Sequence, residues 1–209
     1  GISREMQIRY LEIADEYVKN GSVTEVRLST RPDYINEDIL EYLRRYHVRT
    51  IELGVQSLDE EVLQKSCRGH SINDVYKASE LIRDSGINLG IQTMIGLPGD
   101  SYEKDIDTAE KVIELSPKIV RIYPTLVIRS TFLEKMYYSG KYRPLDLEEA
   151  VGLCAELLRM YESRKINVIR IGLQPTENIS EGMDVVAGPF HPSFRHLVES
   201  KLILNTIES

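Results

Sequence analysis

The chain has only two cysteines, Cys67 and Cys154, which lie far apart in its 209 residues. Two separated thiols provide neither a disulfide framework nor a cysteine-rich metal site, so we expect a reducing compartment, the cytoplasm. Long apolar runs are absent as well. No stretch reaches the roughly 18 residues that a membrane span needs, and no signal-peptide pattern precedes the first amphipathic segment. We therefore expect no membrane partner.

Positive charge is in short supply. The chain has 26 Lys and Arg against 33 Asp and Glu, a formal net charge of −7. That balance argues against a protein that coats nucleic acid by charge alone, although it leaves room for a local basic patch. The basic cluster at residues 44–49 is interpreted as a solvated helix end rather than an RNA site. The hydrophobic fraction of 42% is ordinary for a globular protein.

Hydrophobic periodicity alternates between extended and helical spacing along the chain. Apolar stretches predict strands at 23–29, 48–55, 87–97, 119–128 and 168–173. Helical spacing and capping pairs predict helices at 5–19, 36–46, 71–85, 100–116, 132–139 and 147–165, with a short one beginning at Ser57. Alternating strands and helices with nearly continuous apolar strands predict an α/β fold, a parallel sheet covered by helices.

The number of strands indicates part of a barrel. A closed eight-stranded α/β barrel takes about 250 residues, whereas this chain offers five strands, and its first element is a helix. Periodicity is lost from Pro175 until a last stretch at 194–204. We therefore expect residues 1–174 to form a partial TIM-like barrel and residues 175–209 to form a short C-terminal appendage.

In a parallel α/β barrel the reactive residues lie at the carboxyl ends of the strands. Glu52 and Gln56 have even spacing and share one face of their strand. A carboxylate and an amide that point into a barrel need partners or a ligand, and a buried polar network without a ligand is the alternative. Gln92 shares its strand face with Gly90 and Gly96, whose small size leaves room for close approach.

Other strand-end segments allow two interpretations each. The turn 96–99 leads into a helix whose first amides suit an anion, although many such loops look alike. Arg31 and Asp33 form either a loop-anchoring ion pair or part of a site. Arg68, in Arg-Gly-His, lies either in an exposed turn or over the barrel mouth, where it would reach a carboxylate. His191 receives no assignment. No His-x-x-x-His signature, nucleophile elbow or Walker loop is found.

Five segments occur together in an order and spacing that resemble one family. They are RLSTRPD (27–33), ELGVQS (52–57), RGH (68–70), IGLPG (95–99) and IYPTLVI (122–128). The series, over residues 2–174, resembles radical S-adenosylmethionine (SAM) enzymes, most closely the radical SAM domain of the Elongator catalytic subunit and its shorter bacterial relatives. It is similar, more distantly, to oxygen-independent coproporphyrinogen oxidase.

The resemblance implies a (βα)6 radical SAM barrel of which this chain lacks the first two strands. In that family a three-cysteine loop after the first strand binds a [4Fe–4S] cluster, and a glycine-rich segment after the second strand holds the methionine part of SAM. The first residues, Gly1 to Ser3, resemble those that directly follow the glycine-rich segment. Cys67 and Cys154 do not match the cluster positions. We therefore expect no metal ligands here and an inactive chain when it is taken alone.

The resemblance also assigns residues to the cofactor and the substrate. Gln56 corresponds to a SAM contact, Arg68 to the arginine that reaches the SAM carboxylate, and Gln92 to a polar residue near the ribose. Two further residues, Ile95 and Pro98, would shape the adenine pocket. The substrate cavity is assigned to Glu52, Tyr123 and Thr125. No catalytic residue is assigned.

By the same resemblance, the intact enzyme cleaves SAM reductively to a 5′-deoxyadenosyl radical and needs an electron donor. The Elongator relatives modify the wobble uridine of tRNA with an added acetyltransferase domain, so tRNA is a candidate partner. A coproporphyrinogen-oxidase-like enzyme is the alternative within the family.

Two alternatives come from other classes. An aldolase or lyase barrel would need a strand-end lysine, and no strand end carries one. A non-catalytic module would pair with a partner through its open sheet edge, and we expect this chain to associate with itself through that edge.

Overall fold

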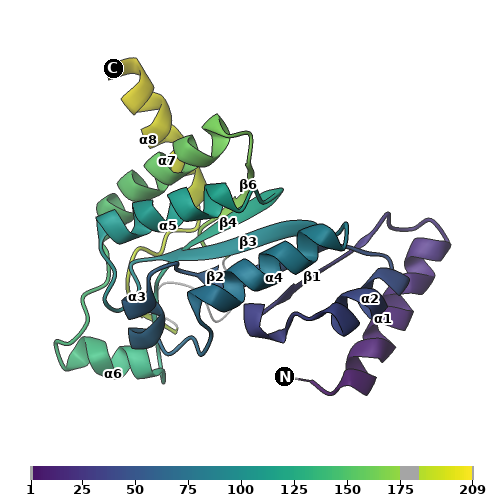
Figure 1. Ribbon diagram of the computed structural model, residues 1–209. Helices are drawn as coiled ribbons and strands as arrows, with labels where there is room; N and C mark the ends of the chain where they lie inside the picture. Colours follow the sequence, from purple (N-terminus) through teal and green to yellow (C-terminus); the bar gives the residue numbers. More distant parts are fainter. Residues whose placement is uncertain (1, 175–183, 209) are drawn as a thin grey trace. The chain divides into compact units, whose positions relative to one another are not determined.

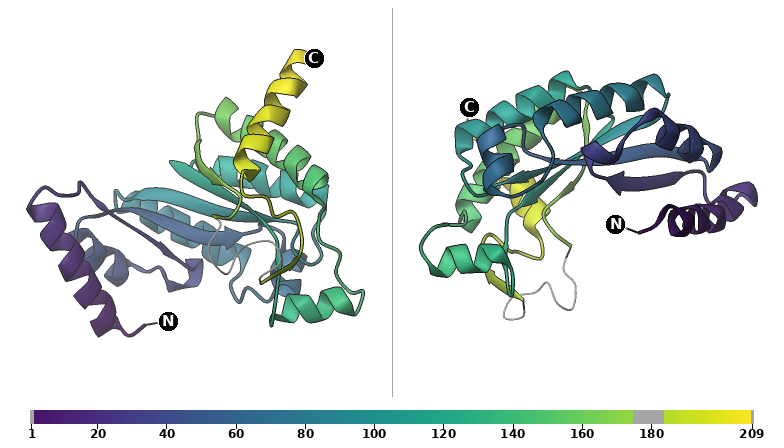
Figure 2. Two further views of the ribbon diagram at one scale, coloured as in Figure 1. Left: turned by 180° about the vertical axis from the view of Figure 1, so that it is seen from behind. Right: turned by 60° about the horizontal axis from the view of Figure 1, so that its bottom comes forward.

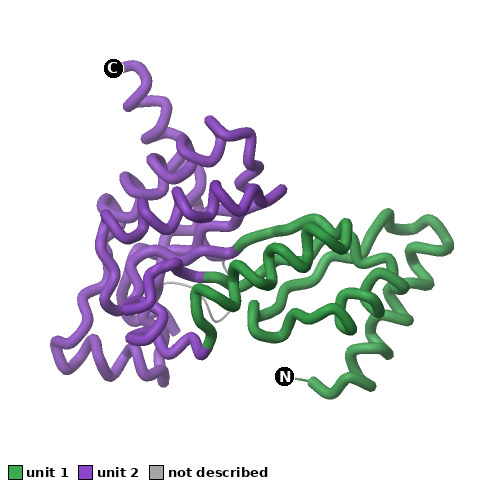
Figure 3. Tube along the Cα trace, in the orientation of Figure 1, with its two compact units in different colours: residues 1–55, 70–91 green, residues 56–69, 92–209 purple. Residues whose placement is uncertain are grey.

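The computed structural model describes residues 2–174 and 184–208 (Figure 1). The chain divides into two compact units, shown in different colours in Figure 3. Unit 1 comprises residues 1–55 and 70–91, and unit 2 comprises residues 56–69 and 92–209. Strands β2 (Val48–Gln56) and β3 (Asn88–Ile95) contribute residues to both units.

The central element is a five-stranded parallel sheet in the order β1-β2-β3-β4-β6, which confirms the predicted α/β fold and strand count. Its other strands are β1 (Val26–Thr30), β4 (Ile119–Pro124) and β6 (Asn167–Ile171). The outermost pairs are both parallel, with Ser29 opposite Glu52 and Ile122 opposite Ile171. β1 and β6 are the two edges of the sheet. Self-association through an edge stays a prediction.

Unit 1 carries the helices α1 (Arg4–Lys19), α2 (Glu37–Arg45) and α4 (Ile72–Asp84), with a short 3-10 turn, η1 (Pro32–Tyr34). The helix starts were predicted correctly at two positions. Asn36 accepts a hydrogen bond from the Ile39 amide, and Ser71 forms a capping box with Asp74. α1 contacts β1, and α4 packs against η1.

Unit 2 carries α3 (Glu60–Lys65), α5 (Tyr102–Glu114), α6 (Phe132–Tyr138), α7 (Leu147–Ser163) and α8 (Phe194–Glu208). α7 contacts α5, β6 and α8, and its inner face is buried along most of its length. Its apolar side chains recur at helical spacing, which is why this helix forms the centre of the unit 2 core. The core side chains it contributes are Leu153, Cys154, Leu157, Leu158 and Tyr161.

Two predicted helix starts were wrong by one or two residues. Asp59, not Ser57, caps α3, because the Ser57 hydroxyl is buried and bonds the Asp59 amide and Thr108. Ser101, not Asp100, caps α5 and accepts from the Lys104 amide. The Asp100 carboxylate instead accepts from the amides on either side of its turn.

The strand predicted over 119–128 is divided. β4 ends at Pro124, and a separate strand, β5 (Val127–Ile128), pairs antiparallel with β7 (Val185–Ala187), which the periodicity did not reveal. Figure 2 shows this pair beside α6, which contacts β5. The last periodic stretch, 194–204, lies within α8. The appendage boundary predicted at Pro175 lies outside the described residues.

In the part of the chain that the structure describes, no helix is both long enough and apolar enough to cross a membrane.

Candidate functional site

A cavity of about 500 Å³ lies within unit 2, at the carboxyl ends of the strands. It is lined by Gln56, Arg68, Gln92, Met94, Tyr123, Pro124, Leu126, Ile128, Arg170, Leu173 and Gln174. The volume is in the range of small-molecule sites, which are mostly apolar with a few convergent polar groups. Four residues predicted from the sequence therefore lie around one space: Gln56, Arg68, Gln92 and Tyr123.

Gln56 ends β2 in a left-handed backbone conformation, with φ of 70°. Such a conformation is uncommon for a residue with a β-carbon and persists where the surroundings impose it. The two residues after Gln56 make the contacts that hold this conformation. The Leu58 amide donates to the Thr108 hydroxyl at 3.1 Å, and Ser57 is buried against the same threonine. The turn is thus fixed to α5, and Gln56 lines the cavity.

Arg68 is held by the end of α3. Its amide donates to the Leu63 carbonyl at 3.1 Å, and Cys67 before it has φ of 54°. The guanidinium is half-buried and donates to the Met94 sulfur at 3.2 Å. A guanidinium beside apolar walls pairs well with a carboxylate, in a fork geometry that lysine does not reproduce.

Alternation along β3 places Gln92 in the cavity lining. Gln92 and Met94 line the cavity, whereas Ile91, Thr93 and Ile95 are buried on the other face. The period of two that the sequence showed around Gln92 is the reason that its side chain lies beside Arg68 and Gln56 in the lining.

A second cavity of about 300 Å³ adjoins the first, since Arg68, Met94 and Leu126 line both. Pro98 and Thr125, two of the predicted residues, line this second cavity. Ile95 lines neither, because its side chain is 1% exposed. It contributes through its carbonyl, which accepts from the Thr125 amide at 3.0 Å and the Thr125 hydroxyl at 2.7 Å.

The turn between β3 and α5 depends on two glycines. Gly96 and Gly99 have φ of 69° and 83°. A β-carbon at Gly96 would lie 2.9 Å from the side chain of Leu145, and one at Gly99 would lie 2.5 Å from the Lys65 side chain. The backbone conformation at both positions favours glycine, and a β-carbon at either position would displace the neighbouring side chain. The turn at 96–99, whose following amides were predicted to suit an anion, is thus preformed. Pro98 in this turn lines the second cavity.

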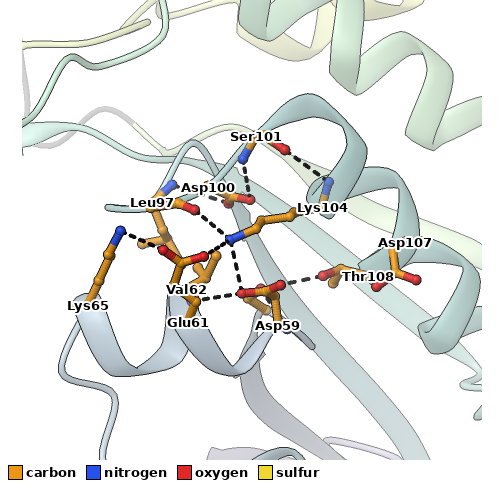
Figure 4. A network of polar contacts seen from close by, with 12 residues as sticks. Asp59, Glu61, Val62, Lys65, Leu97, Asp100, Ser101, Lys104, Asp107 and Thr108 are labelled. Atoms are coloured by element: carbon orange, nitrogen blue, oxygen red, sulfur yellow. Dashed lines mark hydrogen bonds and ion pairs between the residues drawn. The ribbon is translucent and has the colours of Figure 1, made fainter.

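Figure 4 shows the ion pairs that fix this turn from outside. The Lys104 ammonium on α5 donates to the Gly99 carbonyl at 2.9 Å and pairs with Glu61 at 2.6 Å and Asp59 at 3.3 Å on α3. Lys65 adds a second pair to Glu61. The two lysines lower the pKa of the exposed Glu61 carboxyl to about 2. The network joins α3, and hence Arg68, to the turn.

Beneath the turn lies a pair of acids, Asp100 and Asp105, which share a hydrogen bond. Burial, together with the neighbouring Asp100, raises the pKa of Asp105 to about 9. Burial also raises the pKa of Asp100. The Gly96 amide bonds Asp105, and the Tyr142 hydroxyl donates to the Gly96 carbonyl at 2.6 Å. A protonated Asp105 is therefore part of the support of the turn.

Glu52, assigned to the substrate cavity from the sequence, belongs to unit 1. Its side chain is 2% exposed and forms an ion pair with the Arg27 Nε at 3.1 Å. Arg31 and Asp33 form a two-fold ion pair at 2.8 and 2.9 Å, which lowers the pKa of Asp33. These two residues thus anchor the loop after β1, as the ion-pair alternative predicted.

His191 takes a local role. Its Nδ1 accepts from the Ser193 amide at 3.1 Å, and its carbonyl accepts from the Phe194 amide at 3.1 Å. Both bonds lie at the start of α8, where helix amides need acceptors.

Sequence reasoning missed part of the lining. Arg170 reaches the cavity from β6, and its Nη1 donates to the Gln174 side chain at 3.1 Å. The available signal was its even spacing with Gly172 and Gln174 at a strand end. Leu126 and Ile128 were missed because the predicted single strand concealed the break between β4 and β5.

The described residues offer few candidate metal ligands. Among residues 2–174 and 184–208 no group of three or more His, Cys, Asp or Glu is placed to hold a metal ion. Cys67 is exposed and Cys154 is buried, and both are free thiols. Burial raises the pKa of Cys154, so it is a neutral core residue. The two thiols do not provide the three cysteines that the family's cluster loop uses, so the described residues do not fit a [4Fe–4S] cluster.

Known proteins resemble this chain over much of its length. An Elongator complex protein 3 from Schizosaccharomyces pombe is 32% identical over 157 residues, covering 71% of this chain and 29% of that protein. A tRNA uridine(34) acetyltransferase from Methanocaldococcus infernus is 38% identical over 127 residues, covering 59% of this chain and 24% of that protein. An uncharacterized protein from Methanocaldococcus jannaschii is matched over 47% of its length at 34% identity. The chain thus spans half or less of these relatives.

Solved structures agree in fold. The archaeal Elp3 of Methanocaldococcus infernus superposes with a TM-score of 0.73 at 30% identity, over 87% of this chain and 42% of that one. Coproporphyrinogen III oxidase (HemN) of Escherichia coli superposes with a TM-score of 0.62 at 17% identity, over 78% and 38%. The second likeness concerns the fold alone.

The family match covers both parts of the chain. Residues 2–112 match the radical SAM superfamily, and residues 117–203 match the radical SAM C-terminal domain. The resemblance read from five short segments is confirmed, and an aldolase or lyase barrel is no longer needed to explain the strand-end residues. The chain belongs to the radical SAM superfamily.

Proposed function

We propose that this chain is the SAM-binding and substrate-facing part of a radical SAM enzyme that modifies the wobble uridine of tRNA. The observation that carries the proposal is the convergence of Gln56, Arg68 and Gln92 on one largely apolar cavity. Similarity to proteins named tRNA uridine(34) acetyltransferase and Elongator complex protein 3 supports the RNA substrate. The five-stranded sheet is then part of a (βα)6 barrel.

The cavity suits an adenosyl ligand with a carboxylate. Arg68 supplies the cation for the carboxylate, in a guanidinium–carboxylate pair. Gln56 and Gln92 supply amide donors and acceptors for the amino acid and ribose parts, while Met94, Tyr123 and Leu126 provide apolar walls. Pro98 at the adjoining cavity would bound the adenine. When bound together, SAM and a [4Fe–4S] cluster supply a 5′-deoxyadenosyl radical by reductive cleavage.

The chain's own residues position the ligand and shield it from water. The fixed turns at Gln56 and at Gly96–Gly99 keep the polar groups in place before a ligand arrives, which lowers the entropy cost of binding. The apolar lining excludes water, which protects a reactive intermediate from side reactions. Tyr123 accepts a hydrogen bond from Arg121 at 3.2 Å, so its ring is held at the cavity wall.

The test uses the protein expressed from its complete reading frame. It is reconstituted without oxygen with iron and sulfide, reduced in the presence of SAM, and assayed for 5′-deoxyadenosine and for SAM affinity. We expect Arg68→Ala and Gln56→Ala to weaken SAM binding about tenfold or more, since each removes a half-buried polar partner worth about 1–3 kcal/mol. Tyr76→Ala, a matched change at an exposed residue of unit 1, should have no effect.

Product formation that does not change in Arg68→Ala would contradict the assigned SAM site. No product from the wild-type protein under any reductant would favour the non-catalytic alternative, in which the sheet edge binds a partner. A tRNA affinity no better than that of an acidic control protein would remove tRNA as the substrate.

A further inference from the structure

The segment 129–143 differs in composition from the rest of the chain. It has four basic residues, Arg129, Lys135, Lys141 and Arg143, against one acidic residue, Glu134, in a chain whose formal net charge is −7. It also contains four of the fifteen Tyr and Phe residues. Basic and aromatic side chains together are the combination that binds single-stranded nucleic acid, because every base has a face that stacks and every nucleotide a phosphate.

Helix α6 presents three of these residues on one side. Phe132, Lys135 and Tyr138 are spaced by three residues, so they form a stripe along one helix face. We call these three residues the α6 stripe. Phe132 is 69% exposed and Tyr138 is 72% exposed, the highest values among the exposed Phe and Tyr side chains of the described residues. Lys135 lies between them and is exposed, as is Lys141 just after the helix.

The segment is fixed at both ends, so the stripe is preformed. Thr131 caps α6 and donates to the Ile128 carbonyl at 2.6 Å, and the Ser130 amide donates to Glu134 at 2.8 Å. Beyond the helix, the Tyr142 hydroxyl bonds the Gly96 carbonyl. Tyr137 packs on Tyr138 with ring centroids 5.4 Å apart. Glu134, the one acid, is thus used in capping and does not offset Lys135.

The helix borders the candidate site. Phe132, Leu133 and Met136 line the second cavity, which shares Arg68, Met94 and Leu126 with the first. Figure 1 shows α6 at the lower edge of unit 2. A nucleotide that stacks on the stripe would therefore lie next to the cavity in which the proposed reaction takes place.

We propose that the α6 stripe, with Lys141, is a stacking surface for unpaired bases of an RNA substrate. The inference rests on the proposed function, because it names the surface that would hold the RNA beside the SAM site. Phe132 and Tyr138 stack on base faces, and Lys135 and Lys141 lie against phosphates. A net negative chain binds RNA weakly by charge elsewhere, which makes a local surface of this kind necessary for a specific complex.

The experiment measures binding of the complete protein to a fluorescent anticodon stem-loop RNA and to its fully paired duplex control at fixed salt. The variants are Tyr138→Ala, Phe132→Ala and Lys135→Glu. Tyr10→Ala and Lys118→Glu change an exposed tyrosine and an exposed lysine elsewhere in the chain and serve as matched controls. Thermal unfolding of each variant checks its fold, and 5′-deoxyadenosine formation in the absence of RNA checks the SAM site.

We expect each aromatic substitution to weaken stem-loop binding about tenfold or more, the usual loss for a base-stacking ring. Lys135→Glu should also reduce the dependence of binding on salt. The two controls and the paired duplex should change little. Tyr138→Ala should keep its SAM cleavage, since Tyr138 lines neither cavity.

Equal stem-loop binding by Tyr138→Ala, Lys135→Glu and wild type would overturn the stacking surface and leave the SAM chemistry standing. Displacement of the RNA by polyglutamate at the same charge concentration would also overturn it, since an acidic peptide would then be the better partner. Absence of any wild-type RNA binding, with SAM cleavage intact, would overturn the surface and the tRNA substrate together. Failure of SAM cleavage alone would affect only the proposed function.

Discussion

Two buried acids in this chain are accommodated by opposite means. In unit 1, Glu52 is 2% exposed and pairs with Arg27. In unit 2, Asp105 is 6% exposed and lies against a second acid, Asp100, so its pKa rises to about 9. Burial of a charge is costly unless the charge is paired or removed. The first acid lies in an ion pair with a cation, and the second keeps its proton.

The difference matters because each acid belongs to a region that the sequence marked as functional. The ion pair of Glu52 with Arg27 depends on both partners. Asp105 accepts a hydrogen bond from the Gly96 amide, and burial beside Asp100 makes ionisation of its carboxyl costly. Unit 2 should therefore be the part of the molecule whose local stability responds to alkaline pH, and the following substitutions test that contrast.

The largest effect is expected from Asp105→Asn. Because the folded pKa is raised from 3.8 to about 9, the native state holds a proton that the unfolded state releases above pH 4. The resulting stability is fully present below pH 4 and is lost as pH rises toward 9. The free energy of unfolding of wild type should fall relative to Asp105→Asn by up to about 1.4 kcal/mol per pH unit between pH 5 and 8. Urea unfolding at several pH values measures this, and parallel profiles would contradict it.

Arg27→Ala should have the next largest effect. It leaves the Glu52 carboxylate buried without its cation, and removal of one partner of a buried pair destabilises the fold. Since Arg27 is about half exposed, we expect a loss of about 1–3 kcal/mol rather than the full cost of a buried charge. Glu52→Gln in the same background should restore part of the loss, as a double-mutant cycle would show. Additive single effects would mean that the pair contributes nothing.

A smaller effect is expected from Asp100→Asn, which separates the two causes of the raised pKa. Burial is the larger cause and the neighbouring carboxylate the smaller one. The pKa of Asp105 should therefore fall on this substitution yet stay well above 3.8. Carbon-13 NMR titration of the Asp105 carboxyl gives the value directly. A return to the ordinary pKa would show that the neighbour, and not burial, holds the proton.

The smallest effect is expected from Lys104→Met, which removes the exposed ion pairs of Figure 4. Exposed pairs contribute little and are screened by salt. The lowered pKa of Glu61 means that its contribution is present above pH 4.5 and is lost as pH falls toward 2. Any change in the unfolding temperature should disappear in 1 M salt, and a salt-independent loss would indicate that the bond to the Gly99 carbonyl is the important one.

The sequence predicted what depends on local pattern. Alternating periodicity was enough for the five strands and their parallel arrangement, and capping pairs located the starts of α2 and α4. Even spacing singled out Gln56 on one strand and Gln92 on the next as residues of possible function, and both line the cavity. Segment spacing led to the family.

What the sequence did not predict depends on contacts between distant segments. Thr125 breaks the strand after β4 because it bonds the Ile95 carbonyl thirty residues earlier. Ser57 fails as a helix cap because Thr108, far along the chain, engages it. Arg170 lines the cavity, and the only sign of this in the sequence was its even spacing with Gly172 and Gln174. The acid pair was invisible as well, since burial, and not residue type, raises the pKa of Asp105.

Gln56 has a consequence for how substitutions at this position should be interpreted. Its backbone adopts φ of 70°, a conformation that glycine accepts at no cost. A Gln56→Gly protein would therefore have less backbone strain at the strand end, but it would lose the side chain of Gln56 from the cavity lining. This one substitution would leave the stability of the fold equal or higher while it lowers the affinity for the ligand. A natural variant with glycine at this position would therefore be expected to fold in the same way and to bind the ligand weakly.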